Sequence, residues 1–252
     1  MKSILITGAS RGVGKAIALK IAETSKYSHD YSHIILNAHS SSSLLDETAA
    51  TIAELNPDIK CLTSIGDVGD AAYINKLYSQ VKSFTGDVSF VQTLINNAAI
   101  SYTGLLIDMS PEEWNQTIST NLSSIYNTCH AFLPDMIHHK SGQIVNISSV
   151  WGTYGASCEA AYSAAKGGVD SLTKALAKEL APSGISVNAL ALGIVNTEMN
   201  AHLSKEEIDD ICEDIPIGRM MTPEEAAEGV MAILNAPDYL TGAVIKMDGG
   251  WI

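Results

Sequence analysis

Short runs of β-branched and aliphatic residues recur along the chain, separated by longer segments with helical periodicity. The runs cover residues 3–7, 33–38, 60–65, 93–97, 143–148, 185–191 and 243–247, and each predicts a buried strand. The intervening segments predict helices over residues 12–24, 43–56, 70–84, 111–137, 160–181, 204–213 and 222–235. Right-handed crossovers between such elements predict a Rossmann-type α/β fold, a doubly wound parallel sheet inside a three-layer sandwich.

The composition is that of a folded protein with one core. Apolar residues form 46% of the chain and charged residues 17%, which favours a globular core over disorder. The 252 residues contain no linker-like stretch, so we expect a single dinucleotide-binding and catalytic domain over residues 1–252. A formal net charge of −13 repels a phosphate backbone and predicts that nucleic acid is not a partner.

Targeting and metal-binding patterns are absent from the sequence. Only the residues 2–6 precede Thr7, too few for the hydrophobic region of a secretory signal, and no apolar run approaches the roughly 20 residues that span a bilayer. We therefore expect a cytoplasmic protein with no membrane partner. The four cysteines are widely spaced and are interpreted as buried reduced thiols, and His29 and His33 predict a polar connection rather than a metal site.

A glycine-rich segment follows the first predicted strand and opens a helical pattern. It reads Thr7-Gly8-Ala9-Ser10-Arg11-Gly12-Val13-Gly14. Glycines let the chain turn sharply and bring bare backbone N–H groups to a phosphate at a helix N-terminus. A glycine triplet alone is weak evidence, but its place between a strand and a helix predicts a site for the pyrophosphate of a dinucleotide.

The end of the second strand favours NADP(H) over NAD(H). The segment Asn37-Ala38-His39-Ser40 carries no carboxylate where an NAD enzyme would hold the ribose hydroxyls. Arg11, His39 and Ser40 can instead offer positive charge and hydrogen bonds to a 2′-phosphate. The alternative is that Arg11 is only a solvated surface residue.

Tyr162 and Lys166 stand four residues apart on a predicted helix, so both side chains project from the same face. A nearby ammonium favours phenolate over phenol, and we expect it to lower the pKa of Tyr162 into a range useful for proton transfer. Tyr78 and Lys82 have the same spacing elsewhere, so spacing alone decides nothing. Thirteen residues before Tyr162, however, Ser149 follows a strand and can hydrogen-bond a substrate oxygen that gains negative charge.

The glycine loop and the Ser, Tyr and Lys positions together resemble the short-chain dehydrogenase/reductase family over essentially the whole chain. The resemblance implies four catalytic residues, Asn121, Ser149, Tyr162 and Lys166, and its spacing selects Ser149 over the neighbouring Ser148. It implies that Asn121 holds a water between Lys166 and solvent. From the residue alone, Asn121 is equally interpretable as a buried polar residue that stabilises its helix.

The resemblance also extends the predicted cofactor site beyond the glycine loop. Asp67-Val68 resembles the family's adenine contact, Asn96-Asn97-Ala98-Ala99 its turn after the fourth strand, and residues 192–197 its segment beside the nicotinamide. The cofactor contacts expected on this basis are Gly8, Ser10, Arg11, Gly12, Val13, Gly14, His39, Ser40, Asp67, Val68, Asn97, Ala98, Tyr162, Lys166, Gly193, Ile194 and Thr197. Residues 194–215 predict a mobile lid, and the predicted walls of the substrate pocket are Trp151, Tyr154, Cys158, Tyr102 and Met199.

The C-terminal half narrows the resemblance to one branch of the family. Residues 215–219, 222–225, 240–242 and 248–250 resemble 3-oxoacyl-[acyl-carrier-protein] reductases, which implies NADPH-dependent reduction of a 3-oxoacyl thioester. The long connections 24–32 and 86–92 resemble sepiapterin-type carbonyl reductases and imply a small carbonyl substrate instead. A non-catalytic, NADP-sensing regulator is the alternative of another class, against which the four catalytic positions argue.

Two partner predictions follow from the same resemblance. The family pairs the helices that correspond to residues 111–137 and 160–181, which implies a homotetramer. Reductases that use carrier proteins place basic residues near the active-site mouth to hold this acidic partner. Lys140 matches one such position and Ser183 occupies the other, so with a net charge of −13 we expect poor use of a carrier protein and better use of a short thioester or free ketone.

Overall fold

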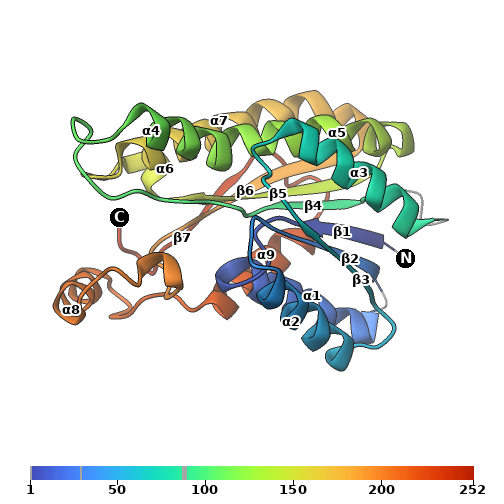
Figure 1. Cartoon of the computed structure of the whole chain (residues 1–252), viewed down its shortest axis with the longest axis horizontal. Helices are drawn as coiled ribbons and strands as arrows, with labels where there is room; N and C mark the ends of the chain where they lie inside the picture. The colour runs from blue at the N-terminus through green and yellow to red at the C-terminus, as the bar shows by residue number, and fades with distance from the viewer. Residues whose placement is uncertain (1, 29, 87–89) are drawn as a thin grey trace.

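The computed structural model describes residues 2–28, 30–86 and 90–252, and within them the chain forms one parallel sheet with the strand order β3-β2-β1-β4-β5-β6-β7. The strands are β1 (Lys2–Ile6), β2 (Tyr31–Ala38), β3 (Lys60–Ile65), β4 (Thr93–Asn96), β5 (Gly142–Ser149), β6 (Ile185–Leu192) and β7 (Val244–Met247). Figure 1 shows helices on both faces of this sheet. The predicted Rossmann-type, three-layer fold is therefore confirmed.

The helices fall into two layers and a projecting segment (Figure 1). One face carries α1 (Gly12–Ser28), α2 (Ser42–Leu55) and α9 (Pro223–Leu234); the other carries α3 (Ala71–Thr85), α4 (Pro111–Ile118), α5 (Ser124–His139), α6 (Trp151–Tyr154) and α7 (Ala160–Leu180). Helix α8 (Lys205–Asp214) stands away from both layers and buries none of its residues. It belongs to the segment that the sequence predicts to be a lid.

Alternating strand residues fill two separate cores, one on each face of the sheet. In β1, Ile4 and Ile6 pack with α1, α2 and α9, whereas Leu5 packs with α3, α5 and α7. The alternation follows from the period of two along a strand, and both sets are buried because helices cover both faces. This explains why the strands appear in the sequence as nearly continuous apolar runs.

Two helical features differ from the prediction. The helix predicted over residues 111–137 is divided, because a π-helical turn (Ser119–Ser123) separates α4 from α5. The π turn has only five residues, too few for a period of its own to be read from the sequence. The one-turn helix α6 was not predicted, since four residues are too few to display a period.

A line of buried polar side chains crosses the centre of the sheet. Asn96 of β4 donates to Asn146 of β5 at 2.8 Å and accepts from Thr128 of α5 at 2.8 Å, while Asn146 donates to Thr173 of α7 at 2.9 Å. Each amide finds its partner on another element, so burial carries no penalty for unpaired groups. These bonds fix the registry of two strands and two helices beneath the functional edge.

Other predictions concern residues outside or only partly inside the described ranges. His29 and residues 87–89 lie outside the described residues, so the His29–His33 pattern and the full length of the 86–92 connection stay predictions.

Cys129 is buried as expected, but the expectation was wrong for Cys61, Cys158 and Cys212, which are partly accessible. Among the residues described, no helix is long and apolar enough to cross a bilayer, and no group of three potential ligands is placed to hold a metal ion.

Candidate active site

The candidate site lies where the strand order changes direction. Strand β1 pairs with β2 on one side and with β4 on the other, so the chain runs outward from β1 in both directions. In open parallel sheets this switch point leaves a crevice beyond the carboxyl ends of the strands, where ligands bind. The glycine loop, Asn97, Ser149 and Gly193 each follow or end one of these strands.

The glycine loop is shaped for close approach of a ligand. Gly8 and Gly12 have positive φ angles of 66° and 54°, in the region that favours glycine. A Cβ at Gly14 would overlap the carbonyl oxygen of Gly8, and one at Gly12 would lie 3.3 Å from Thr197 Cγ2. The loop therefore presents bare backbone at the N-terminus of α1, which fits a pyrophosphate group.

The turn after β4 holds the glycine loop in place through hydrogen bonds. Asn97 donates its side-chain amide to the carbonyls of Thr7 at 2.9 Å and Gly8 at 3.1 Å. The hydroxyl of Thr7 in turn accepts from the backbone N–H groups of Asn97 at 3.0 Å and Ala98 at 3.1 Å. In this structure Asn97 and Ala98 thus support the glycine loop through four hydrogen bonds.

The residues predicted to read the adenosine half lie at the ends of β2 and β3. Arg11, His39 and Ser40 are all exposed, as a contact with a 2′-phosphate requires. Val68 is buried, and Asp67 accepts from the N–H of Gly69 at 2.8 Å, which leaves its main role in shaping the turn.

The sequence analysis missed Asn127. Its amide donates to the carbonyls of Val68 at 3.1 Å and Gly69 at 3.0 Å, so α5 holds the adenine-side turn in place. The available signal was its position six residues after Asn121 on the same predicted helix, a second polar residue in a buried stretch.

Ser149, Tyr162 and Lys166 come together at the carboxyl end of β5. Ser149 ends that strand and accepts from the backbone N–H of Trp151 at 3.2 Å, and its side chain hydrogen-bonds with the Tyr162 hydroxyl. Lys166 is buried one turn further along α7, with its Nζ 5.5 Å from the centre of the Tyr162 ring. Ser148 faces the other way and donates to Asp170 at 2.6 Å, so only Ser149 reaches the tyrosine.

The pKa of Tyr162, next to Lys166, differs from the expectation. Burial raises the pKa of Tyr162 above its ordinary value, the negative charge of Glu159 raises it further, and the hydrogen bond with Ser149 acts in the opposite direction. Burial lowers the pKa of Lys166 from 10.5 to about 8, although the charge of Asp170 opposes this change. The predicted lowering of the Tyr162 pKa was wrong for the protein alone, because the cost of burying a phenolate outweighs a lysine that is itself desolvated.

Asn121 sits in the π-helical turn and points at the loop after β4. Its amide donates to the carbonyl of Ile100 at 2.8 Å, and its carbonyl oxygen accepts from the Ile100 N–H at 2.8 Å. The side chain is buried, and both of its polar ends are bonded to one residue of another element. A π turn is common at functional sites because it redirects a side chain from the regular helical course.

Lys166 donates to the carbonyl of Ile147 at 2.7 Å, on the strand that ends in Ser149. Asn121 and Lys166 thus each hold backbone beside the site, Asn121 on the loop after β4 and Lys166 on β5.

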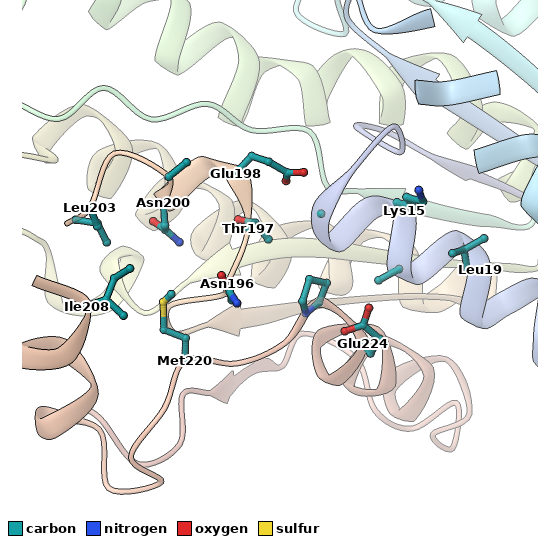
Figure 2. Close-up of a pocket in the computed structure, with 14 residues that line it drawn as sticks. Lys15, Leu19, Asn196, Thr197, Glu198, Asn200, Leu203, Ile208, Met220 and Glu224 are labelled. Atoms are coloured by element: carbon teal, nitrogen blue, oxygen red, sulfur yellow. The ribbon is translucent and has the colours of Figure 1, made fainter. Parts of the chain in front are cut away.

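The segment after β6 lines a cavity beside the glycine loop. Figure 2 shows this cavity, of about 630 Å³, between the first turns of α1 and the segment 196–201, with Ile208 of α8 and Met220 on its far side. Thr197 and Gly12 both line it, while Gly193 packs against Asp248. The predicted nicotinamide segment and the predicted pyrophosphate loop are therefore neighbours.

The predicted walls of the substrate pocket occupy different surroundings. Trp151 packs edge-on against Trp251 at 5.1 Å between ring centres, a C-terminal contact that the sequence analysis did not foresee. Tyr154 is mostly exposed with Lys246 over its ring, Tyr102 donates to Gln116 at 3.0 Å, and Met199 is exposed on the lid segment. Cys158 has a positive φ of 62°, a strained conformation for a residue other than glycine.

Comparisons with known proteins identify the family of this chain. The sequence model of the short chain dehydrogenase family matches residues 2–208 of this chain. An uncharacterized oxidoreductase of Bacillus subtilis, YmfI, is 36% identical over 252 residues, covering 99% of this chain and 98% of that protein. The 3-oxoacyl-[acyl-carrier-protein] reductase FabG of Chlamydia muridarum is 36% identical over 254 residues, covering 99% of this chain and 96% of its own.

A solved structure extends the similarity to three dimensions. The crystal structure of 3-oxoacyl-[acyl-carrier protein] reductase from Brucella melitensis superposes with a TM-score of 0.89 at 28% identity, covering 100% of this chain and 91% of that one. The parallel sheet and the similarity to this reductase thus define a Rossmann-like oxidoreductase fold. The chain belongs to the short chain dehydrogenase family.

Proposed function

We propose that this protein reduces a ketone to an alcohol with NADPH, with Tyr162 as the general acid and a 3-oxoacyl thioester or a related small ketone as substrate. The observation that carries the proposal is the hydrogen-bonded pair of Ser149 and Tyr162 with Lys166 buried behind it, at the strand edge that also bears the glycine loop. The relatives named as 3-oxoacyl-[acyl-carrier-protein] reductases support the substrate class.

Each side chain has a separate part in the reaction. Bound NADPH would supply the hydride that adds to the carbonyl carbon. Ser149 and Tyr162 hold the carbonyl oxygen through their hydroxyl groups, and the Tyr162 proton passes to that oxygen as it becomes an alkoxide. The raised pKa of Tyr162 keeps the phenol protonated before the reaction, as a proton donor must be. The Lys166 ammonium stabilises the phenolate that remains.

Exposed groups in the glycine loop and beyond β2 support a preference for NADPH. Arg11, His39 and Ser40 are accessible at the end where a 2′-phosphate would lie, and β2 ends without a carboxylate. We expect Arg11→Ala to lower kcat/KM for NADPH by about ten- to a hundredfold, as loss of a charge-assisted hydrogen bond predicts. Its effect on NADH should stay within about threefold, and an equal loss with both cofactors would contradict the assignment.

The position of Lys140 bears on the use of a carrier protein. Lys140 precedes the first residue of β5, and its carbonyl lies against Gly184, just before β6 begins. Ser149 lies at the other end of β5, roughly 25 Å away for a strand of this length. Within one chain, Lys140 and Ser149 therefore lie at opposite ends of β5. A short thioester or free ketone is the substrate we propose.

We also propose assembly into a homotetramer through α4, α5 and α7. Trp114 on α4 and Tyr126 on α5 are large apolar side chains that remain exposed, as does Ile107 in the preceding loop. Large apolar side chains that stay exposed on the helices of one layer support an interface there. Light scattering that gives the mass of one chain would reject this proposal.

The deciding experiment is NADPH oxidation with acetoacetyl thioesters, diketones, quinones and pterins as parallel substrates. Turnover of at least one ketone, lost in Tyr162→Phe, is the expected result. Binding of NADPH without turnover of any ketone would overturn the proposed function and favour a cofactor-sensing role.

A further inference from the structure

One ionisable group beside Tyr162 has no part in the mechanism above. Glu159 is the residue before α7, three residues ahead of Tyr162 and so close to the same helical face. It is partly buried, and its side chain does not cap the helix. Its Oε2 instead accepts from the hydroxyl of Ser101, at 3.2 Å, in the loop after β4. The carboxylate therefore lies between two elements that border the site.

The backbone around Glu159 is fixed on both sides. The preceding residue, Cys158, has its φ at 62°, and its carbonyl accepts from the N–H of Gly104 at 2.8 Å. The carbonyl of Glu159 accepts from the N–H of Ser163 at 2.9 Å, within the first turn of α7. Strain of this kind persists only where the surrounding contacts impose it, and it is concentrated at functional sites.

The charge of Glu159 acts on the reacting group. It is the one coulombic influence among the causes that raise the pKa of Tyr162. Burial raises the pKa of Glu159 itself, while the Ser101 hydrogen bond and the charge of His202, on the lid segment, lower it. Within the ranges that the structure describes, Oε1 of Glu159 accepts no hydrogen bond from the protein. One acceptor of a carboxylate whose charge is felt at Tyr162 is thus left without a protein donor among the described residues.

We propose that Glu159 is a specificity residue. It disfavours ketones that carry a carboxylate near the carbonyl. It favours ketones that are neutral there or carry a hydrogen-bond donor or a positive charge. A carboxylate on the substrate would lie within about 10 Å of Glu159, and two like charges at that distance near a protein surface cost enough to change relative rates by on the order of tenfold. An ammonium or hydroxyl group could instead donate to the open oxygen. This proposal rests on the proposed ketone reductase function.

The test compares ketones of similar size and different charge. These are 3-oxobutanoate as the anion, 3-oxobutanamide as its neutral counterpart and 4-amino-2-butanone as the cation. We expect Glu159→Gln to raise the anion-to-amide ratio of kcat/KM about tenfold and to lower the cation-to-amide ratio. Glu159→Asp, which keeps the charge, should hold both ratios near those of the unchanged protein.

The matched control is Glu179→Gln, which removes the same charge from the exposed last turn of the same helix. About 25 Å of helix separates Glu179 from Tyr162, so both ratios should stay at their starting values. An equal change for all three ketones in Glu159→Gln, or an equal response in Glu179→Gln, would overturn the specificity role.

Failure of the proposed function would look different. In that case no ketone is reduced by the unchanged protein, and the same three compounds are then measured for binding in the presence of NADPH by calorimetry. A rise in affinity for the anion relative to the amide in Glu159→Gln supports the assignment of Glu159 even there. Unchanged relative affinities would reject it.

Discussion

Two tyrosine–lysine pairs in this protein share one spacing and differ in almost everything else. Tyr78 and Lys82 lie on α3, and Tyr162 and Lys166 lie on α7. The distance from Nζ to the ring centre is 5.8 Å in the first pair and 5.5 Å in the second. Helical spacing therefore sets nearly the same geometry in both, and geometry within the pair does not distinguish a catalytic site from a surface contact.

The surroundings make the difference. Tyr78 donates to Asp135 at 2.9 Å, and Lys82 forms an ion pair with the same carboxylate at 3.1 Å, so the α3 pair fastens α3 to α5 at an accessible position. In the α7 pair, Lys166 is buried and Tyr162 faces a serine hydroxyl at a strand end. A tyrosine whose hydroxyl is occupied by a carboxylate cannot hold a substrate oxygen. The strand end, rather than the spacing, therefore distinguishes the pair that we propose to be catalytic.

The largest contrast is expected when each tyrosine loses its hydroxyl. Tyr162→Phe should lower kcat for ketone reduction about a thousandfold, since a positioned general acid contributes on the order of 10²–10⁴. Tyr78→Phe should leave kcat within about twofold. Steady-state NADPH oxidation with both variants gives the comparison.

Circular dichroism and NADPH binding serve as controls for these two variants. Both should match the unchanged protein, because neither substitution alters the volume or the backbone. A similar loss of activity in the two variants would contradict the distinction between the pairs.

The two lysines should differ next in their response to pH. The pKa of Lys166 is lowered to about 8, so its ammonium is present below that pH and is lost as pH rises through it. Since the raised pKa of Tyr162 keeps the phenol protonated in this range, kcat/KM for NADPH should fall about tenfold per pH unit above about 8. Lys166→Arg should move this fall to higher pH, and Lys82→Arg should not.

The lowered pKa of Lys166 also predicts how the stability of the fold depends on pH. The folded pKa of Lys166 lies below its unfolded value, so unfolding takes up a proton between about pH 8 and 10.5. The free energy of unfolding should therefore rise with pH across this interval as far as Lys166 contributes.

For the activity, a profile of kcat/KM that stays flat to pH 10 would show that the Lys166 ammonium is not required.

The sequence predicted the strands and the layer order well because parallel strands covered on both faces are apolar at most positions. It also brought Ser149, Tyr162 and Lys166 together correctly, since each follows from a strand end or a helical spacing. The π turn at Asn121 was not predictable in this way, because a stretch of five residues is too short to display a period that differs from that of an α-helix.

Long-range contacts between side chains, or between a side chain and the backbone, were the other omission. Trp251 meets Trp151 and Asn127 holds the turn at Val68 only after the chain has folded, and no local pattern encodes either contact. The pKa of Tyr162 was misjudged for the same reason. The lysine four residues away was weighed, but the sequence did not show the depth of burial, and the charge of Glu159, three residues ahead of Tyr162, was overlooked.

The smallest effect is expected at the carboxylate that holds the surface pair. Asp135→Asn removes the charge opposite Lys82 but keeps a group that can hydrogen-bond Tyr78, so the free energy of unfolding in urea should fall by less than about 1 kcal/mol. The ion pair is accessible to solvent, and water and salt screen it. Activity should be unchanged, because the side-chain partners of Asp135 are Tyr78 and Lys82 of α3, and neither belongs to the proposed active site. A double-mutant cycle of Asp135→Asn with Lys82→Met, at equal protein concentration, isolates the coupling between the two charges. A coupling energy above about 2 kcal/mol, or a loss of ketone reduction in Asp135→Asn, would mean that the α3 pair is more than a fastening between two helices.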